Sequence, residues 1–167
     1  NPETSVTQTV AGSTTGVSGA VDAVGTNALF NSPTSITTDG TYLYVSDSAN
    51  HTIRRIEIST STVSTFIGSA GNGGSSDGVG DSARLLTPRG LALDMSSLYI
   101  ADQGAHTIRQ VSLESSLVST LSGKYMQSGS SDGLGAEGLY NGPCGLVSDG
   151  NVLIISDQSN HAVRVLR

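Results

Sequence analysis

One short stretch occurs three times in the chain and constrains the fold more than any other feature. The copies begin at residues 42, 97 and 152 and read YLYVSDSANHTIRRI, SLYIADQGAHTIRQV and VLIISDQSNHAVRVL. Each copy carries one histidine, and His51, His106 and His161 follow one another at a constant interval. A fixed period is typical of a repeat protein, in which each repeat is one supersecondary unit packed against its neighbours.

Each repeat contains four short runs that favour β-strands. In the middle repeat they span residues 89–94, 97–102, 106–113 and 117–123, and they are rich in Val, Ile, Leu, Tyr and Thr. Turns of a few residues containing Asp, Gly, Ser or Asn separate them, as in antiparallel hairpins. The sequence therefore predicts an all-β fold, a β-propeller of four-stranded antiparallel blades with three blades present. A β-sandwich could use similar strands, but strict tandem repetition favours the propeller.

The composition excludes several classes of function. The formal net charge is −6, which disfavours binding to a phosphate backbone and argues against a nucleic-acid partner. No run approaches the 18 or so consecutive apolar residues of a transmembrane helix, so we expect no membrane insertion. Cys144 is the only cysteine, so neither an intrachain disulfide nor a thiolate metal cluster can form. We read it as a packing residue.

The ordered motifs resemble the NHL repeat. The pattern is an Asp-Gly-x-Gly segment, an apolar anchor (Phe30, Leu85 or Tyr140), a proline, a strand ending in Asp, then Leu-Tyr-(Val/Ile)-(Ser/Ala)-Asp and Asn-His-x-Ile-Arg. The first copy departs most from this pattern, with Asp22-Ala23 in place of Asp-Gly and Thr34-Ser35 where the second copy has Arg89-Gly90. The second copy has Ala105 where Asn precedes His in the other two. The resemblance covers nearly the whole chain, in repeats that span approximately residues 13–68, 69–123 and 124–167. It implies a propeller that serves as a binding platform, of which these blades would form half of a six-bladed ring.

The two ends of the chain are offset by one strand. Residues 5–12 match the fourth strand of the first two repeats, whereas the last repeat lacks its fourth strand. We therefore expect residues 1–167 to form a single propeller segment that carries a strand donor. The partner would be the missing blades of a longer chain, a second copy in a closed head-to-tail pair, or successive copies in a filament. Strand exchange would involve Val6, Gln8, Val10, Val163 and Val165.

The repeat signature offers candidate chemistry, and we predict a structural role for it. An active site needs different residues in different blades, but these positions recur identically. An Asp and an Arg seven residues apart on neighbouring strands should form a buried pair in each blade. Each histidine should cap its hairpin locally. No catalytic, cofactor or metal residue is predicted. The signature positions are Asp47, His51, Arg54, Asp102, His106, Arg109, Asp157, His161 and Arg164.

Other polar positions favour turns or modification. We expect turn-forming roles for Asp77 and Asp132, each followed by Gly, and for Asp39, Asp94 and Asp149 at the ends of the first strands. Asn50-His51-Thr52 fits the acceptor pattern for an N-linked glycan.

Two hypotheses for the function follow from these features. The first is a non-catalytic scaffold that binds other protein chains, including further copies of itself, in an extracellular or cell-surface setting. The alternative is a lyase or hydrolase with a metal in the central channel. The resemblance implies that alternative, because some NHL-like propellers are zinc-dependent lyases. Such an enzyme would need a non-repeated set of His and Tyr residues, which the sequence does not place.

Overall fold

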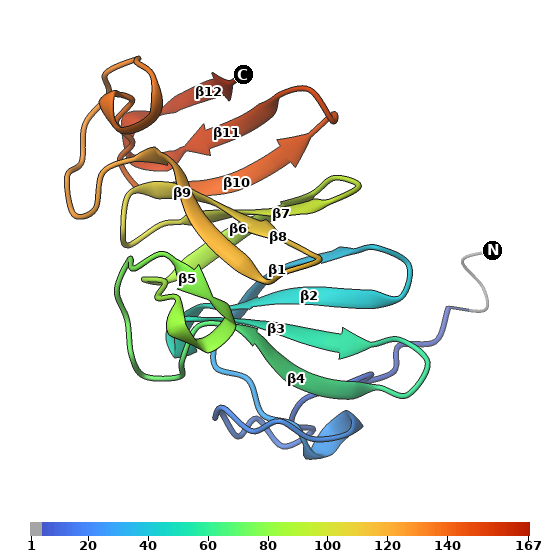
Figure 1. Ribbon diagram of the computed structural model, residues 1–167. Coiled ribbons are helices and arrows are strands. Elements are labelled where there is room, and N and C mark those ends of the chain that lie inside the picture. Colours follow the sequence, from blue (N-terminus) through green and yellow to red (C-terminus); the bar gives the residue numbers. More distant parts are fainter. Residues whose placement is uncertain (1–4) are drawn as a thin grey trace.

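The computed structural model describes residues 5–167 and contains three antiparallel sheets that follow one another as an open arc of blades (Figure 1). The first sheet has the strand order β1-β2-β3-β4, the second β5-β9-β8-β7-β6 and the third β10-β11-β12. The inner strands β1, β6 and β10 contact one another from blade to blade. This arrangement confirms the predicted all-β propeller architecture, in a segment that is not closed.

The strands follow the same order from repeat to repeat, with a 3-10 helix in each connection and another after the second strand of the first and third blades. Their bounds are η2 Gly25–Asn27, β1 Pro33–Thr38, β2 Tyr42–Asp47, η3 Ser48–Asn50, β3 Thr52–Glu57, β4 Thr62–Ile67, β5 Gly78–Val79, η4 Gly80–Ser82, β6 Pro88–Leu93, β7 Ser97–Asp102, β8 Thr107–Ser112, β9 Leu117–Gly123, η5 Gly135–Glu137, β10 Pro143–Ser148, β11 Leu153–Asp157, η6 Gln158–Asn160 and β12 Ala162–Leu166. In the described part of the chain, no helix has the length and hydrophobicity needed to cross a bilayer.

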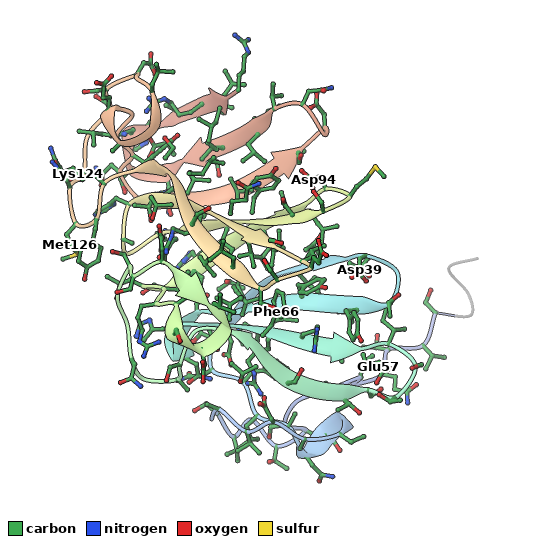
Figure 2. All side chains as sticks on the ribbon, viewed as in Figure 1. Asp39, Glu57, Phe66, Asp94, Lys124 and Met126 are labelled. Carbon is green, nitrogen blue, oxygen red and sulfur yellow. The ribbon has the colours of Figure 1, made fainter. Side chains whose placement is uncertain are left out.

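The first hairpin of each blade is closed by an aspartate, as predicted. The Asp39 carboxylate accepts hydrogen bonds from the amides of Thr41 and Tyr42 at 2.8 and 2.7 Å. Asp94 does the same in the second blade and Asp149 in the third. Asp39 and Asp94 lie at the same end of their blades (Figure 2). Bonds of this kind replace the backbone pairing that a tight turn lacks.

Apolar side chains fill the space between adjacent sheets. Leu85 is fully buried between the first two blades, and Tyr140 is 4% exposed between the second and third. Both are the apolar anchors of the repeat pattern, each three residues before the proline that begins an inner strand. The inner strands approach closely because Gly90 has no side chain: a Cβ there would lie 2.5 Å from the carbonyl oxygen of Cys144. The blades are therefore held both by burial and by close backbone contact.

The repeated histidines join one blade to the next. His51 and His106 both adopt the left-handed conformation, each with φ of 60°. The amide of Thr87 donates to His51 Nδ1 at 3.2 Å, and the amide of Gly142 donates to His106 Nδ1 at 3.0 Å. The prediction of a purely local hydrogen bond was wrong for these side chains. Each accepts from a residue 36 positions further along the chain, in the following blade.

Candidate interaction site

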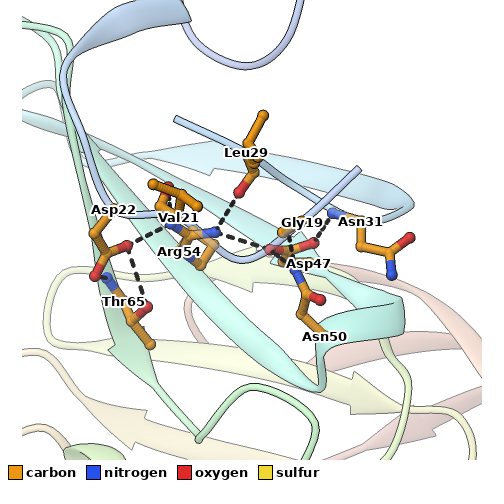
Figure 3. Close-up of polar contacts among 9 residues, drawn as sticks. All are labelled: Gly19, Val21, Asp22, Leu29, Asn31, Asp47, Asn50, Arg54 and Thr65. Carbon is orange, nitrogen blue, oxygen red and sulfur yellow. Dashed lines mark hydrogen bonds and ion pairs between the residues drawn. The ribbon is translucent and has the colours of Figure 1, made fainter. Parts of the chain in front are cut away.

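A buried arginine in each blade organises the polar contacts around the third strand. Arg54 is 1% exposed, and its guanidinium donates to Asp47 at 3.0 Å and to the carbonyls of Leu29 and Val21 at 2.9 and 3.0 Å. It also contacts the carboxylate of Asp22 (Figure 3). Two carboxylates and two carbonyls thus satisfy a charge that would be costly to bury alone.

The same arginine contacts recur in the other two blades. Arg109 lies 3.5 Å from Asp102 and 2.7 Å from Asp77. Arg164 lies 3.2 Å from Asp157 and 2.6 Å from Asp132. The predicted pairing of an aspartate with the arginine seven residues later is therefore present in each repeat.

The second carboxylate on each arginine was not predicted as a partner. Asp77 and Asp132 were expected to form turns, but each ion-pairs with the arginine of its own blade. Gly78 lies in the short strand β5, which pairs with the outer strand β9. The connection between blades is therefore anchored to the blade it enters by charge, and its glycines are not simply turn residues.

A threonine of the outer strand covers this second carboxylate in the first two blades. Thr65 donates its amide to Asp22 at 3.0 Å and its hydroxyl at 3.2 Å, and the Thr120 hydroxyl donates to Asp77 at 3.0 Å. Burial acts to raise the pKa of Asp77, but hydrogen bonds from Thr120 and Arg109 lower it below its ordinary value. The Asp77 carboxylate is thus stabilised in its charged form.

The third blade leaves the corresponding aspartate open. The side chain of Asp132 is 96% exposed, compared with 47% for Asp22 and 52% for Asp77. No strand of the described chain lies beyond β12 in this sheet, so no threonine reaches Asp132. The contrast shows that the outer strand, and not the connection, shields this carboxylate in a complete blade.

The same edge exposes apolar side chains beside a groove. Val163 is 76% exposed and Val165 is 52% exposed, whereas Ile53 and Ile108, which correspond to Val163, are fully buried. A groove with a cavity volume of about 380 Å³ runs along β12, between its side chains and Asp132. An unpaired strand with exposed valines offers both backbone hydrogen-bonding groups and apolar surface to a further strand.

The predicted strand donor forms no strand within its own chain. Val6 is 89% exposed and Val10 is 52% exposed, and residues 5–10 carry no regular secondary structure. The amide of Gly12 donates to the carbonyl of Gly25 at 3.2 Å, which ties the segment to the connection that enters the first blade. The exchange between Val6, Gln8 or Val10 and the β12 valines remains a prediction, because it requires a second polypeptide.

Asn50, the candidate glycan acceptor, is committed to internal hydrogen bonds. The residue is 8% exposed, and its side-chain amide donates to the carbonyl of Gly19 at 2.8 Å and to Asp47 at 2.7 Å. A glycan on this nitrogen would displace both bonds. Asn160 makes the equivalent contacts to Gly129 and Asp157. Residues 5–167 contain no group of three His, Cys, Asp or Glu side chains placed to hold a metal ion.

Comparison with known proteins connects this geometry to a family. No family model matches the chain. The chain is 37% identical over 108 residues to cattle NHL repeat-containing protein 2, and 29% identical over 134 residues to the chicken protein of the same name. These matches cover 60% and 74% of the chain. The chain is similar to NHL repeat-containing proteins. It spans 14% and 18% of the length of those relatives.

Solved structures share the fold of the chain. The fold is similar to that of an auxiliary nutrient binding protein from Bacteroides thetaiotaomicron, with a TM-score of 0.71 and 26% sequence identity. The match covers 78% of this chain and 36% of that protein. The NHL signature residues therefore occupy an arc that corresponds to part of a larger fold.

The sequence could have indicated the contact between the outer-strand threonine and the aspartate of the connection. Thr65 and Thr120 are separated by one full repeat, and so are Asp22 and Asp77. The recurrence of a threonine and an aspartate at the same interval could have suggested that the two residues of each repeat are in contact. The outer strands were predicted only as β-strands, and no role was assigned to their threonines. The missed signal was Thr65, a polar residue at an alternating position of β4 whose other members, Val63 and Ile67, are apolar.

Proposed function

We propose that the chain is a non-catalytic NHL scaffold that binds other polypeptides through its open blade edges, and that it assembles head to tail by donating an outer strand. The observation that carries this proposal is the edge of β12, where Val163 and Val165 are exposed. The corresponding strands β3 and β8 are each covered by an outer strand. Strand addition satisfies such an edge with backbone hydrogen bonds and buries its apolar residues.

The contacts between blades support the same arrangement. Ser46 donates to the carbonyl of Arg89 at 2.7 Å, and Ser48 donates to that of Pro88 at 2.5 Å. The amide bonds to His51 and His106 recur at both interfaces, and the backbones of adjacent inner strands approach closely at Gly90. A heterologous interface of this kind can join the last blade of one copy to the first blade of another, closing as a ring or continuing as a filament.

The native mass of the chain in solution tests the proposal. Light scattering on the purified chain should give at least twice the chain mass of 17.0 kDa. Val163→Lys places a charge on the open edge and should shift the particle toward the single-chain mass. Met95→Lys, a change at a fully exposed residue in the turn between β6 and β7 of the middle blade, is the matched control. A particle that remains at the single-chain mass across micromolar concentrations would contradict self-assembly.

A further inference from the structure

We infer that residues 6–12 of a second copy fill the groove beside β12, with Thr9 placed over Asp132 as Thr65 is placed over Asp22. The inference rests on the proposed function and adds the register of the strand and the contacts that select it. Three separate observations at the two ends of the arc support it. They concern Gly12, Thr9 and His161.

Gly12 sets the register of the donated strand. Its amide donates to the carbonyl of Gly25 at 3.2 Å, as the amide of Gly68 donates to that of Gly80 at 3.1 Å. Its φ is 100°, close to 90° for Gly68 and 92° for Gly123. Gly12 therefore already has the conformation in which an outer strand ends before a connection. The connection from Gly12 to Asp22 is one residue longer than the connection from Gly68 to Asp77. With Gly12 aligned to Gly68, the segment before Gly12 corresponds to β4.

The same position requires glycine in a complete blade. A Cβ on Gly68 would lie 2.6 Å from the carbonyl oxygen of His51, and a Cβ on Gly123 would lie 2.5 Å from that of His106. In the inferred pair, Gly12 meets the carbonyl of His161 in the second copy. The chain thus provides a glycine with the required φ at the one place in the donor where a side chain would clash.

This register brings Thr9 to the position of Thr65 and Thr120. The arginine of each complete blade faces that threonine in the strand ladder, since Arg54 pairs with Thr65 and Arg109 with Thr120. In the pair of copies, Thr9 faces Arg164 and its amide and hydroxyl reach Asp132. The open carboxylate of one copy is then matched by a hydrogen-bond donor of the other.

The inward positions of the donor are also suitable. Val63, Phe66 and Ile67 are the buried residues of β4, and they correspond to Thr7, Val10 and Ala11. Val6 and Gln8 then face outward. The residues that face the blade are therefore Thr7, Val10 and Ala11, and not the alternating residues Val6, Gln8 and Val10. The smaller donor residues fit beside Tyr140, which lines the groove from the other side.

A second contact joins the same two ends. His161 has φ of 53° and is exposed, and it corresponds to His51 and His106. Ser32 has φ of 57°, corresponds to Thr87 and Gly142, and is also exposed. Within the chain these positions pair through an amide donated to Nδ1. His161 of one copy therefore accepts from the Ser32 amide of the next.

A cysteine pair tests the register directly. In a Cys144→Ser background, Thr9→Cys combined with Asp132→Cys should form a disulfide between copies under mild oxidation, seen as a covalent dimer. Thr9→Cys combined with Asp77→Cys is the matched control. It should not crosslink, because Thr120 of the same chain already occupies that site.

Two substitutions measure the contacts without a crosslink. Thr9→Val removes the hydroxyl and should weaken association about five- to tenfold, the loss expected for one hydrogen bond. Gln8→Ser, an outward change to the residue found in β4 and β9, should leave association unchanged. His161→Ala should weaken association, and His161→Asn should restore it because the amide oxygen can accept in place of Nδ1.

The outcomes separate this inference from the proposed function. A particle of twice the chain mass that forms no Thr9–Asp132 crosslink would overturn the inference and leave self-assembly intact. Equal crosslinking in the Asp77 control would also overturn it. A particle at the single-chain mass overturns both, and would mean that the groove is filled by a different polypeptide.

Discussion

Ala105 leaves one buried carboxylate short of a hydrogen bond. Asn50 and Asn160 donate to the aspartate three residues earlier, both at 2.7 Å. Ala105 cannot do so, and Oδ2 of Asp102 has no hydrogen-bond partner in the described chain. The consequence is electrostatic. Desolvation by burial raises the pKa of Asp102 to about 7, against the opposing effects of the Leu86 amide and the Arg109 charge.

Restoring asparagine at this position should stabilise the second blade. Ala105→Asn offers Asp102 the donor that the other repeats possess, and we expect a gain of about 1–2 kcal/mol in the free energy of unfolding. Denaturant unfolding measures it. The reverse change, Asn50→Ala, should cost a similar amount in the first blade, and an unchanged or lower stability of Ala105→Asn would contradict this explanation of Asp102.

The pH dependence of stability should change with the same substitution. Folded Asp102 holds its proton up to about pH 7, whereas the unfolded carboxyl releases it near its ordinary pKa of 3.8. Its contribution to stability is therefore present at low pH and is lost as the pH rises through about 7. Unfolding curves should be measured between pH 4 and pH 8. The free energy of unfolding of Ala105→Asn should exceed that of the unsubstituted chain most at the upper end of this range. A constant difference across this range would argue against a raised Asp102 pKa.

The buried arginine pair should be costly to break. Asp47→Ala leaves Arg54, which is 1% exposed, without its interior carboxylate, and we expect a loss of about 3–5 kcal/mol. Asp22→Ala removes the half-exposed partner of the same arginine and should cost clearly less. Thermal unfolding of both variants compares their losses of stability. Equal losses would show that burial of Asp47 does not make its contact with Arg54 more stabilising than that of Asp22.

At the level of the elements, the histidines determine how one blade sits on the next. His51→Ala removes the acceptor for the Thr87 amide and should destabilise the chain by about 1 kcal/mol. It should also speed hydrogen exchange at that amide. His51→Asn keeps an acceptor and tolerates the left-handed conformation, so it should retain most of the protection. Exchange at Thr87 that is identical in all three proteins would mean that packing alone joins the blades.

The sequence predicts elements well where the information is local. The strands follow from apolar runs in three aligned copies, and the Asp47–Arg54 pair follows from a hairpin that puts residues seven apart on adjacent strands. The acceptor role of His51 toward Thr87 was missed, since it depends on the placement of one sheet against another. The partnership of Asp22 with Arg54 was missed for a similar reason, because the two lie 32 residues apart along the chain.

At the level of the whole molecule, the middle blade is the one with neighbours on both sides. Core residues of β7 and β8 such as Leu98 and Ile108 are fully buried, whereas the third blade exposes its last strand. Stability in such an array is a sum of units and nearest-neighbour interfaces. In the single-chain state, which the Val163→Lys variant should favour, native-state hydrogen exchange should therefore be slowest in β7 and β8 and faster in β12 by at least tenfold. Uniform protection across the three sheets would instead indicate a single cooperative unit.

The connection that enters a blade packs against the strands that follow it in the chain, as Asp22 contacts Arg54 and Thr65 and Asp77 contacts Arg109 and Thr120, so one period of the sequence corresponds to one blade. The chain leaves the first sheet at Gly68 and the second sheet at Gly123, and both glycines have a positive φ. Duplicating any segment of one full period would therefore insert one whole blade and leave both terminal surfaces as they were. Proteins of this construction can lengthen by tandem duplication, because each added blade would reuse the contacts that already join neighbouring blades.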